Sequence, residues 1–194
     1  MKRIFALILL PVSFACNNGT DNKPNNMLPA DTTVITPVPK AEELINPGNG
    51  IGKFVIGLPT DSAIALLGQP DSSDAAMGSA LMSWYAKDAN RYRTAIFAGR
   101  NMGNDEVSRI KRIMVEAPGY KTADGIAPGV SMAEIEKYFQ LKQVNDPVAQ
   151  SKGLLVYDDI EKGIIFDIDS VSKLCKAITV HKAGDSASTY INMH

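Results

Sequence analysis

The pattern of apolar and polar residues divides the chain into three parts. Residues 4–10 form an uninterrupted apolar run within a first segment, 1–15. Residues 16–49 are rich in Asn, Pro, Thr, Asp and Gly and show no apolar periodicity, which predicts a flexible tether. From residue 50 onward, segments with apolar residues at helical spacing alternate with segments typical of strands, which predicts the folded region.

Two segments of the folded region share the same helix pattern. Each begins with a glycine, Gly57 or Gly129, and continues with a branched apolar residue and a helix-start signal. In the second segment Ser131 and Glu134 form a capping box, in which each side chain satisfies a free backbone N–H of the first helical turn. The apolar faces expected to be buried are Ala63, Leu66 and Leu67 in the first helix, and Ile135, Tyr138 and Phe139 in the second.

Strand patterns follow each predicted helix. They predict one hairpin and one closing strand in each half: residues 81–86, 94–98 and 112–119, then 154–158, 163–168 and 177–184. This order predicts an α+β fold with two tandem modules, 50–122 and 123–194, each a helix on an antiparallel sheet. A single α+β domain whose two helices merely resemble each other is the alternative.

The apolar run at the start of the chain is typical of an export signal. Two basic residues precede it, and the segment 1–15 stops just before Cys16. A run this short cannot cross a hydrocarbon core of about 30 Å as a permanent helix, so its removal after export is expected. A cysteine directly after the cleavage site resembles the bacterial lipoprotein signal, in which the thiol receives a diacylglycerol. Ser13 and Ala15 would equally suit ordinary cleavage, which would leave Cys16 as a free thiol.

Composition and charge narrow the possible partners. The formal net charge is −1 for the 194 residues and becomes −3 once Lys2 and Arg3 leave with the signal, which argues against a nucleic-acid partner. Cys175 is the second of two cysteines, so no intramolecular disulfide is expected if Cys16 carries lipid. The expected location is the cell envelope, at the outer membrane, with attachment through the N-terminal lipid and with the leaflet left open.

No residue pattern predicts an active site, and we expect neither enzyme activity nor a cofactor or metal. Cys175 and His181 share one face of a predicted strand but are about 20 Å apart, too far for a nucleophile and its base. The acidic residues in 158–169 lack a calcium-loop pattern and predict a solvated strand face. An enzyme that uses these carboxylates is the catalytic alternative.

Aromatic and arginine residues gather at the tip of the first predicted hairpin. They are Trp84, Arg91, Tyr92 and Arg93. Such side chains give large contact areas at low entropic cost and dominate interface hot spots, which predicts a surface for a protein partner. Arginines that only solvate the loop are the alternative.

The segment GLPTDSAIALLGQP, from Gly57 to Pro70, resembles the segment G-M-T-x-x-x-V-x-x-L-L-G-x-P of the SmpA/OmlA (BamE-type) outer-membrane lipoproteins. Those lipoproteins share an architecture with the β-lactamase inhibitor protein, in which two tandem modules pack helices on an antiparallel sheet. Pro59 and Ala63 replace the usual Thr and Val, and Gln140 stands where the second copy should have Gly. The resemblance implies a non-catalytic protein-binding or envelope-assembly role. A tethered or secreted enzyme inhibitor is the alternative.

Overall fold

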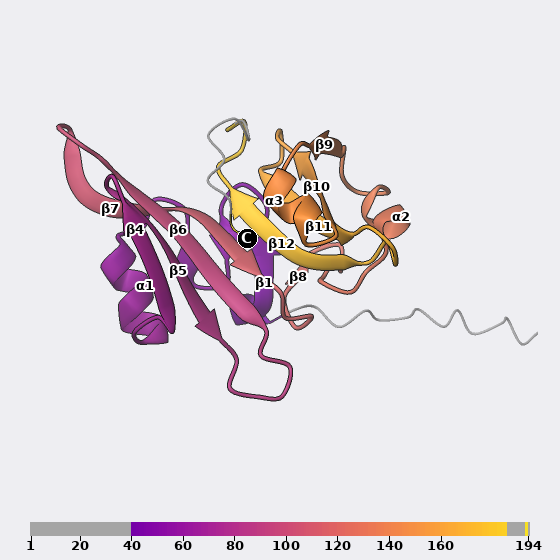
Figure 1. Ribbon diagram of the computed structural model, residues 1–194, viewed down its shortest axis with the longest axis horizontal. Coiled ribbons are helices and arrows are strands. Elements are labelled where there is room, and N and C mark those ends of the chain that lie inside the picture. The colour runs from indigo at the N-terminus through magenta and orange to yellow at the C-terminus, as the bar shows by residue number, and fades with distance from the viewer. Residues whose placement is uncertain (1–39, 186–192, 194) are drawn as a thin grey trace, which may run out of the picture. The chain divides into compact units, whose positions relative to one another are not determined.

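The computed structural model describes residues 40–185 and Met193, and most of their regular structure is β-strand (Figure 1). One large antiparallel sheet has the strand order β4 (Ser72–Ala76), β5 (Ser79–Tyr85), β6 (Arg93–Asn101), β7 (Asp105–Val115), β12 (Cys175–His181), β11 (Ile164–Asp169), β10 (Leu154–Asp159) and β9 (Lys142–Val144). Neighbours in sequence are neighbours in the sheet except at its centre, where β7 pairs with β12.

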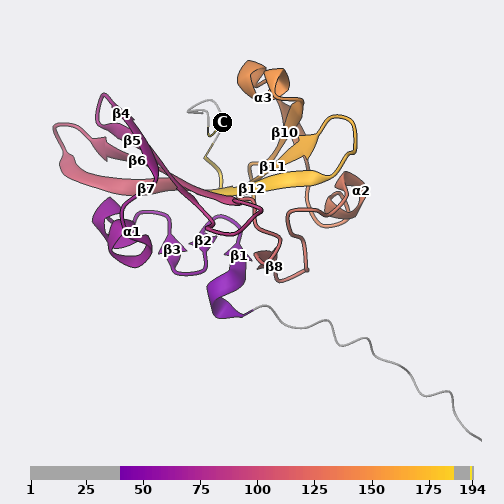
Figure 2. The same cartoon turned by 60° about the horizontal axis from the view of Figure 1, so that its bottom comes forward.

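A smaller sheet and four short helices complete the described part. The small sheet has the order β3 (Phe54–Val55), β2 (Gly50–Ile51), β1 (Leu44–Asn46) and β8 (Lys121–Thr122). The helices are η1 (Ala41–Glu43, a 3₁₀ turn), α1 (Thr60–Leu67), α2 (Met132–Ile135) and α3 (Pro147–Ser151). Figure 2 shows α1, α2 and the small sheet on one face of the large sheet, and α3 on the opposite face.

The main core lies between the large sheet and the elements around α1, α2 and the small sheet. Alternation along β11 illustrates it: Phe166 points into this core, whereas Ile165 belongs to a separate cluster with Ala149 of α3. Phe166 is fully buried, and its ring lies 5.0 Å from that of Phe139, centroid to centroid. Complete burial of such a side chain stabilises the fold by about 1.5–3 kcal/mol.

The predicted α+β fold of two helix-on-sheet modules is wrong. The three α-helices have eight, four and five residues, so they cannot form a layer over a sheet of this width. The strands expected to close two separate modules, β7 and β12, pair with each other and merge all eight into one sheet. Residues 44–46, placed in the tether by composition, form β1, and Ile45 is buried in the main core.

The two similar sequence segments nevertheless occupy equivalent backbone positions. Gly57 and Gly129 both have positive φ, 90° and 97°, which glycine adopts without steric cost. The N–H of Gly57 donates to the carbonyl of Ile110 on β7, and the N–H of Gly129 donates to the carbonyl of Cys175 on β12. Each glycine therefore joins the start of a short helix to one of the two central strands.

Half of the predicted capping box is present. The hydroxyl of Ser131 accepts a hydrogen bond from the backbone N–H of Glu134 at 3.3 Å. The carboxylate of Glu134 instead forms an ion pair with Lys137, one turn along the helix. The cap thus starts α2 at the predicted residue, but the helix ends after four residues.

Candidate functional site

One face of the large sheet carries buried polar side chains. This is the face on which α3 lies, here called the α3 face. Arg112 on β7 is directly opposite His181 on β12, and Asp158 on β10 is opposite Ile165 on β11. The buried polar residues of the large sheet that share this face include Ser83, Arg112, Asp158, Asp167, Thr179 and His181. Burial of so many polar groups costs free energy unless they are hydrogen-bonded. Their hydrogen-bond partners therefore indicate whether this face has a structural or a chemical role.

His181 and Asp158 form a buried pair. Nε2 of His181 lies 3.1 Å from Oδ1 of Asp158, and Nδ1 lies 2.9 Å from the carbonyl oxygen of Lys182. A carbonyl oxygen can only accept, so Nδ1 carries a proton. The hydrogen bond between Nε2 and the carboxyl group then needs a second proton, which makes the pair an imidazolium–carboxylate or its proton-shifted neutral form.

The geometry of this pair favours a structural role over catalysis. The side chains of His181 and Asp158 are 3% and 0% exposed, and both ring nitrogens of the imidazole already face an acceptor. No ring nitrogen is left to take a proton from a substrate. The pair instead links β12 to β10 across β11, which lies between them.

The acidic residues of 158–169 are not the solvated strand face that the sequence predicts. Asp158, Asp159 and Asp167 are buried. The carboxylate of Asp159 accepts from the backbone N–H groups of Gln140 and Lys162, at 2.9 and 3.1 Å, and so fixes the turn between β10 and β11. Among the described residues, no three His, Cys, Asp or Glu side chains come together in an arrangement that could hold a metal ion.

Cys175 belongs to the main core and lies on the opposite face of the sheet from His181. The sequence predicts both on one face because they are six residues apart. A register shift between Asp167 and Ile168 of β11, opposite the start of β12, breaks this alternation. Cys175 is 2% exposed, and burial, together with the nearby Asp167 carboxylate, raises the pKa of its thiol.

The raised pKa of Cys175 predicts a loss of stability at alkaline pH. The unfolded chain releases this proton near the ordinary value of 9.0, whereas the folded chain retains it. The free energy of unfolding should therefore be unaffected below pH 9 and fall by up to about 1.4 kcal/mol per pH unit above it. Urea unfolding from pH 7 to pH 10.5 measures this slope. Cys175→Ala should show a shallower slope, and equal slopes in the two proteins would contradict the prediction.

Met193 is held on the α3 face. It is fully buried in an apolar cluster, here called the Met193 socket, formed by Leu81, Ala95, Phe97, Met114 and Ala177. Its backbone carbonyl accepts a hydrogen bond from Nη1 of Arg93 at 2.6 Å. Nε of Arg93 donates to the hydroxyl of Ser83 at 2.9 Å, which orients the guanidinium.

The residues predicted for partner binding have different surroundings. Trp84 is buried in the main core, and its indole N–H donates to the carbonyl of Gly68 at 3.0 Å. Arg93 is half-buried and bound to Met193. Arg91 is exposed and Tyr92 is half-buried, so these two are accessible to a partner. Cys16, the predicted lipid attachment site, lies outside the described residues.

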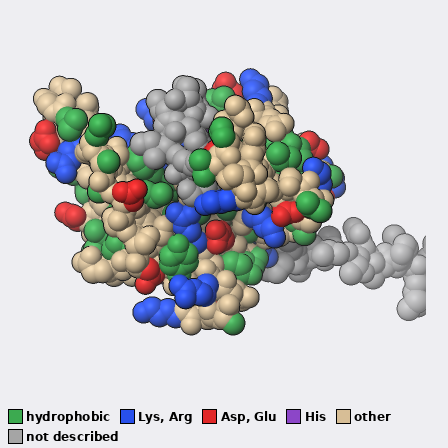
Figure 3. All heavy atoms as spheres, in the orientation of Figure 1, with side chains coloured by type: hydrophobic (Ala, Val, Ile, Leu, Met, Phe, Trp, Pro, Cys, Tyr) green, Lys and Arg blue, Asp and Glu red, His purple; other side chains and the backbone are tan. Residues whose placement is uncertain are grey.

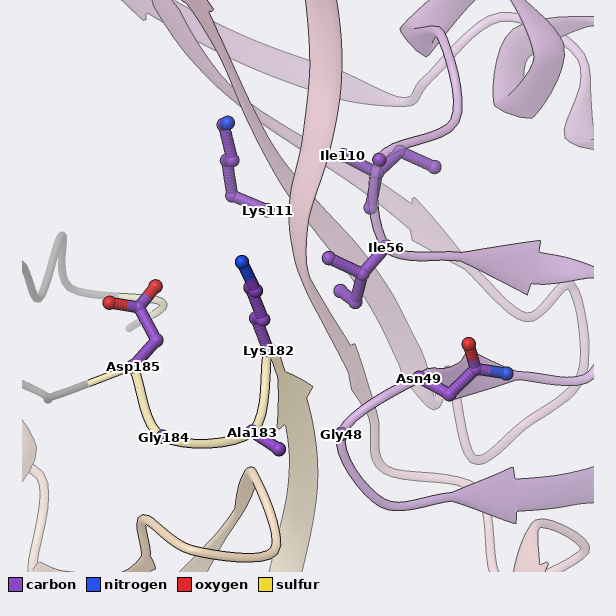
Figure 4. Close-up of a pocket in the computed structure, with 10 residues that line it drawn as sticks. Gly48, Asn49, Ile56, Ile110, Lys111, Lys182, Ala183, Gly184 and Asp185 are labelled. Carbon is purple, nitrogen blue, oxygen red and sulfur yellow. The ribbon is translucent and has the colours of Figure 1, made fainter.

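A surface hollow lies beside β7, where β12 ends. Its volume is about 710 Å³, and its lining includes Ile56, Ile110, Lys111, Lys182 and Asp185. Figure 4 shows the two lysines and the aspartate on one side of β7, and the two isoleucines on the other. The charged side thus carries more positive than negative groups. The sequence gives no signal for this hollow, because its lining comes from four separate segments.

None of the described helices is long and apolar enough to cross a membrane. No protein-family profile matches the chain, and no curated protein matches its sequence. The resemblance to the SmpA/OmlA lipoproteins therefore stays a prediction.

Two solved structures are similar to parts of the chain. One is an extracellular protein containing an SCP domain from Bacillus anthracis str. Ames, at 8% identity and a TM-score of 0.45 over 66% of this chain and 44% of that protein. The chain thus spans less than half the length of that protein. The other is the uncharacterized protein yfeY from Escherichia coli, at 14% identity and a TM-score of 0.39 over 70% and 98%. Likeness at these scores carries no argument about function.

Proposed function

We propose that this protein is a lipid-anchored protein of the cell envelope, at the outer membrane, that binds a protein partner without catalysis. The export signal, Cys16 and the polar segment 16–49 support the location. The loop between β5 and β6, residues 86–92, supports the binding role. The observation that carries the proposal is the fixed, exposed position of Arg91 in this loop.

Arg91 is held in place by Asp88 and Tyr85, which precede it in the chain. Its φ is +51°, a left-handed conformation that costs an arginine about 1–2 kcal/mol. The carboxylate of Asp88 offsets this cost by accepting from the N–H groups of Asn90 and Arg91, at 3.0 and 3.1 Å. The guanidinium of Arg91 lies over the ring of Tyr85, 5.5 Å from its centroid. A loop ordered before binding loses little entropy when a partner docks.

Two shallow hollows flank this loop. One, of about 170 Å³, is lined by Arg91, Tyr85 and Asp71 among others. The other, of about 180 Å³, lies beside Tyr92 and includes Leu174, which is 39% exposed. Basic side chains extend from the loop into solvent (Figure 3), and Lys87 and Arg91 are both exposed. Arginine and aromatic side chains next to hollows are typical of interface hot spots.

Site-specific photo-crosslinking in intact cells tests the proposal. A photoreactive amino acid at position 91 or 92 should give one discrete crosslinked product, identified by mass spectrometry. The matched control is the same amino acid at Lys152, an exposed position next to α3. Arg91→Ala, with the crosslinker at position 92, should reduce the product about tenfold or more, as loss of a hot-spot residue does. The same products from positions 92 and 152 would show that this loop is not the binding surface.

A further inference from the structure

The Met193 socket holds its side chain as a peptide-binding surface holds a ligand residue. Small residues, Ala95 on β6 and Ala177 on β12, leave room beside the larger Phe97 and Met114. The methionine side chain is fully buried there, and Arg93 donates a hydrogen bond to the backbone carbonyl of the same residue. A pocket for an apolar side chain and a hydrogen bond to the main chain are the two kinds of contact that peptide-binding surfaces use.

The socket is formed by residues distant in sequence from Met193. Its members, between Leu81 and Ala177, lie on β5, β6, β7 and β12. Backbone ladders join these strands, and none of their pairs involves Met193. Arg93 is oriented by the hydroxyl of Ser83, which is also independent of Met193. The binding surface is therefore built by the sheet, and Met193 occupies it as a separate segment of the chain.

We propose that the Met193 socket is a peptide-binding site, occupied here by the chain's own residue 193. The partner ligand is an extended segment of another protein with a methionine or leucine side chain, whose carbonyl oxygen accepts from Arg93. Met193 competes with this segment from within the same chain. This inference uses a surface separate from the 86–92 loop, and it does not depend on the proposed function.

Because Met193 of the same chain occupies the socket, an added peptide should bind with reduced affinity. Seven residues separate Asp185 from Met193, and a short connection of this kind gives the tethered residue an effective concentration in the millimolar range. An added peptide must displace Met193, so it should bind the unaltered protein weakly. A protein whose residue 193 cannot enter the socket should bind the same peptide at least tenfold more tightly.

Fluorescence anisotropy with a labelled synthetic peptide of residues 186–194 tests this difference. The purified full-length protein should bind the peptide weakly, and Met193→Asp should bind it at least tenfold more tightly, because a carboxylate is excluded from an apolar socket. The matched control is Met77→Asp, a change at a methionine that is 92% exposed, and it should bind like the unaltered protein. A labelled peptide that itself carries Asp at position 193 should not bind.

Met193→Leu keeps an apolar side chain in the socket and should exclude the peptide as the unaltered protein does. It therefore shows whether a change at position 193 disturbs the fold by itself. A measurement on the unaltered protein guards against loss of folding in Met193→Asp. With ¹³C-methyl methionine labelling, the Met193 signal should move to its solvent-exposed position when unlabelled peptide is added in excess. Equal peptide affinities for the unaltered protein and Met193→Asp, or no binding to either, would overturn the proposal. A dimer that dissociates on Met193→Asp would show exchange between two copies and would overturn it as well.

Discussion

Asp158→Ala is expected to lower the free energy of unfolding by at least about 1–3 kcal/mol, the cost of leaving a buried polar group without its hydrogen-bond partner. The change leaves the imidazole of His181 buried, with Nε2 facing no acceptor in place of the carboxylate oxygen at 3.1 Å. It also removes the connection between β10 and β12. Urea unfolding monitored by circular dichroism measures the change in the free energy of unfolding at pH 7.

Two variants give this prediction its controls. Asp124→Ala removes an exposed carboxylate and should change the free energy of unfolding by no more than about 0.5 kcal/mol. Asp158→Asn should cost less than Asp158→Ala, because the amide can donate to Nε2 of a neutral His181 and keep the pair hydrogen-bonded. If Asp158→Ala costs less than about 1 kcal/mol, the pair does not stabilise the sheet in the way that its geometry indicates.

The strands could be predicted from sequence because their signals are local. The expected segments 81–86, 94–98, 154–158 and 163–168 coincide with β5, β6, β10 and β11 to within a few residues. In each, branched or aromatic apolar residues stand close together between turn signals, so a few neighbouring positions decide the conformation. The pairing of β7 with β12 joins residues more than sixty positions apart, and no local pattern reports it.

The helical sequence pattern predicted more buried helix residues than the structure contains. Ala63 is buried, as predicted, but Leu66 and Leu67 are 53% and 36% exposed. Helix α1 ends at Leu67, and the next residue, Gly68, has a positive φ, so the two leucines stand in a last turn that no other element covers completely. Periodicity shows which residues share a helix face, but not how much of that face meets another element.

The buried polar group could not be assigned from sequence for a different reason. Asp158 and His181 are 23 positions apart, on strands that another strand separates. An aspartate within a strand of apolar residues has the same alternating pattern whether its face meets solvent or protein. The burial of Asp158 and Asp167 depends on what covers the α3 face, and the alternation of a strand carries no information on that. The burial of Met193 could not be predicted for the same reason, because the residues of its socket lie on four strands, the last of them at Ala177.

Cys16→Ser is expected to move the protein almost completely from the detergent phase to the aqueous phase in a Triton X-114 partition of whole cells. A single acyl chain holds a protein only marginally at a membrane, at about 0.8 kcal/mol per buried CH₂, so stable attachment needs the two or more chains that lipoprotein modification adds. Serine at position 16 receives none of them. Incorporation of labelled palmitate should be lost in the same variant.

Cys175→Ala is the matched control, because it removes the other cysteine of the chain and leaves the signal intact. It should partition with detergent as the unaltered protein does, since the Cys175 thiol is buried in the main core and accepts no lipid there. If the unaltered protein is already in the aqueous phase, Cys16 carries no lipid. The small residues Ser13 and Ala15 then direct ordinary cleavage, and the protein is secreted or periplasmic rather than anchored. The 86–92 loop would then act on a partner that the protein reaches by diffusion, without the high local concentration that a shared membrane provides.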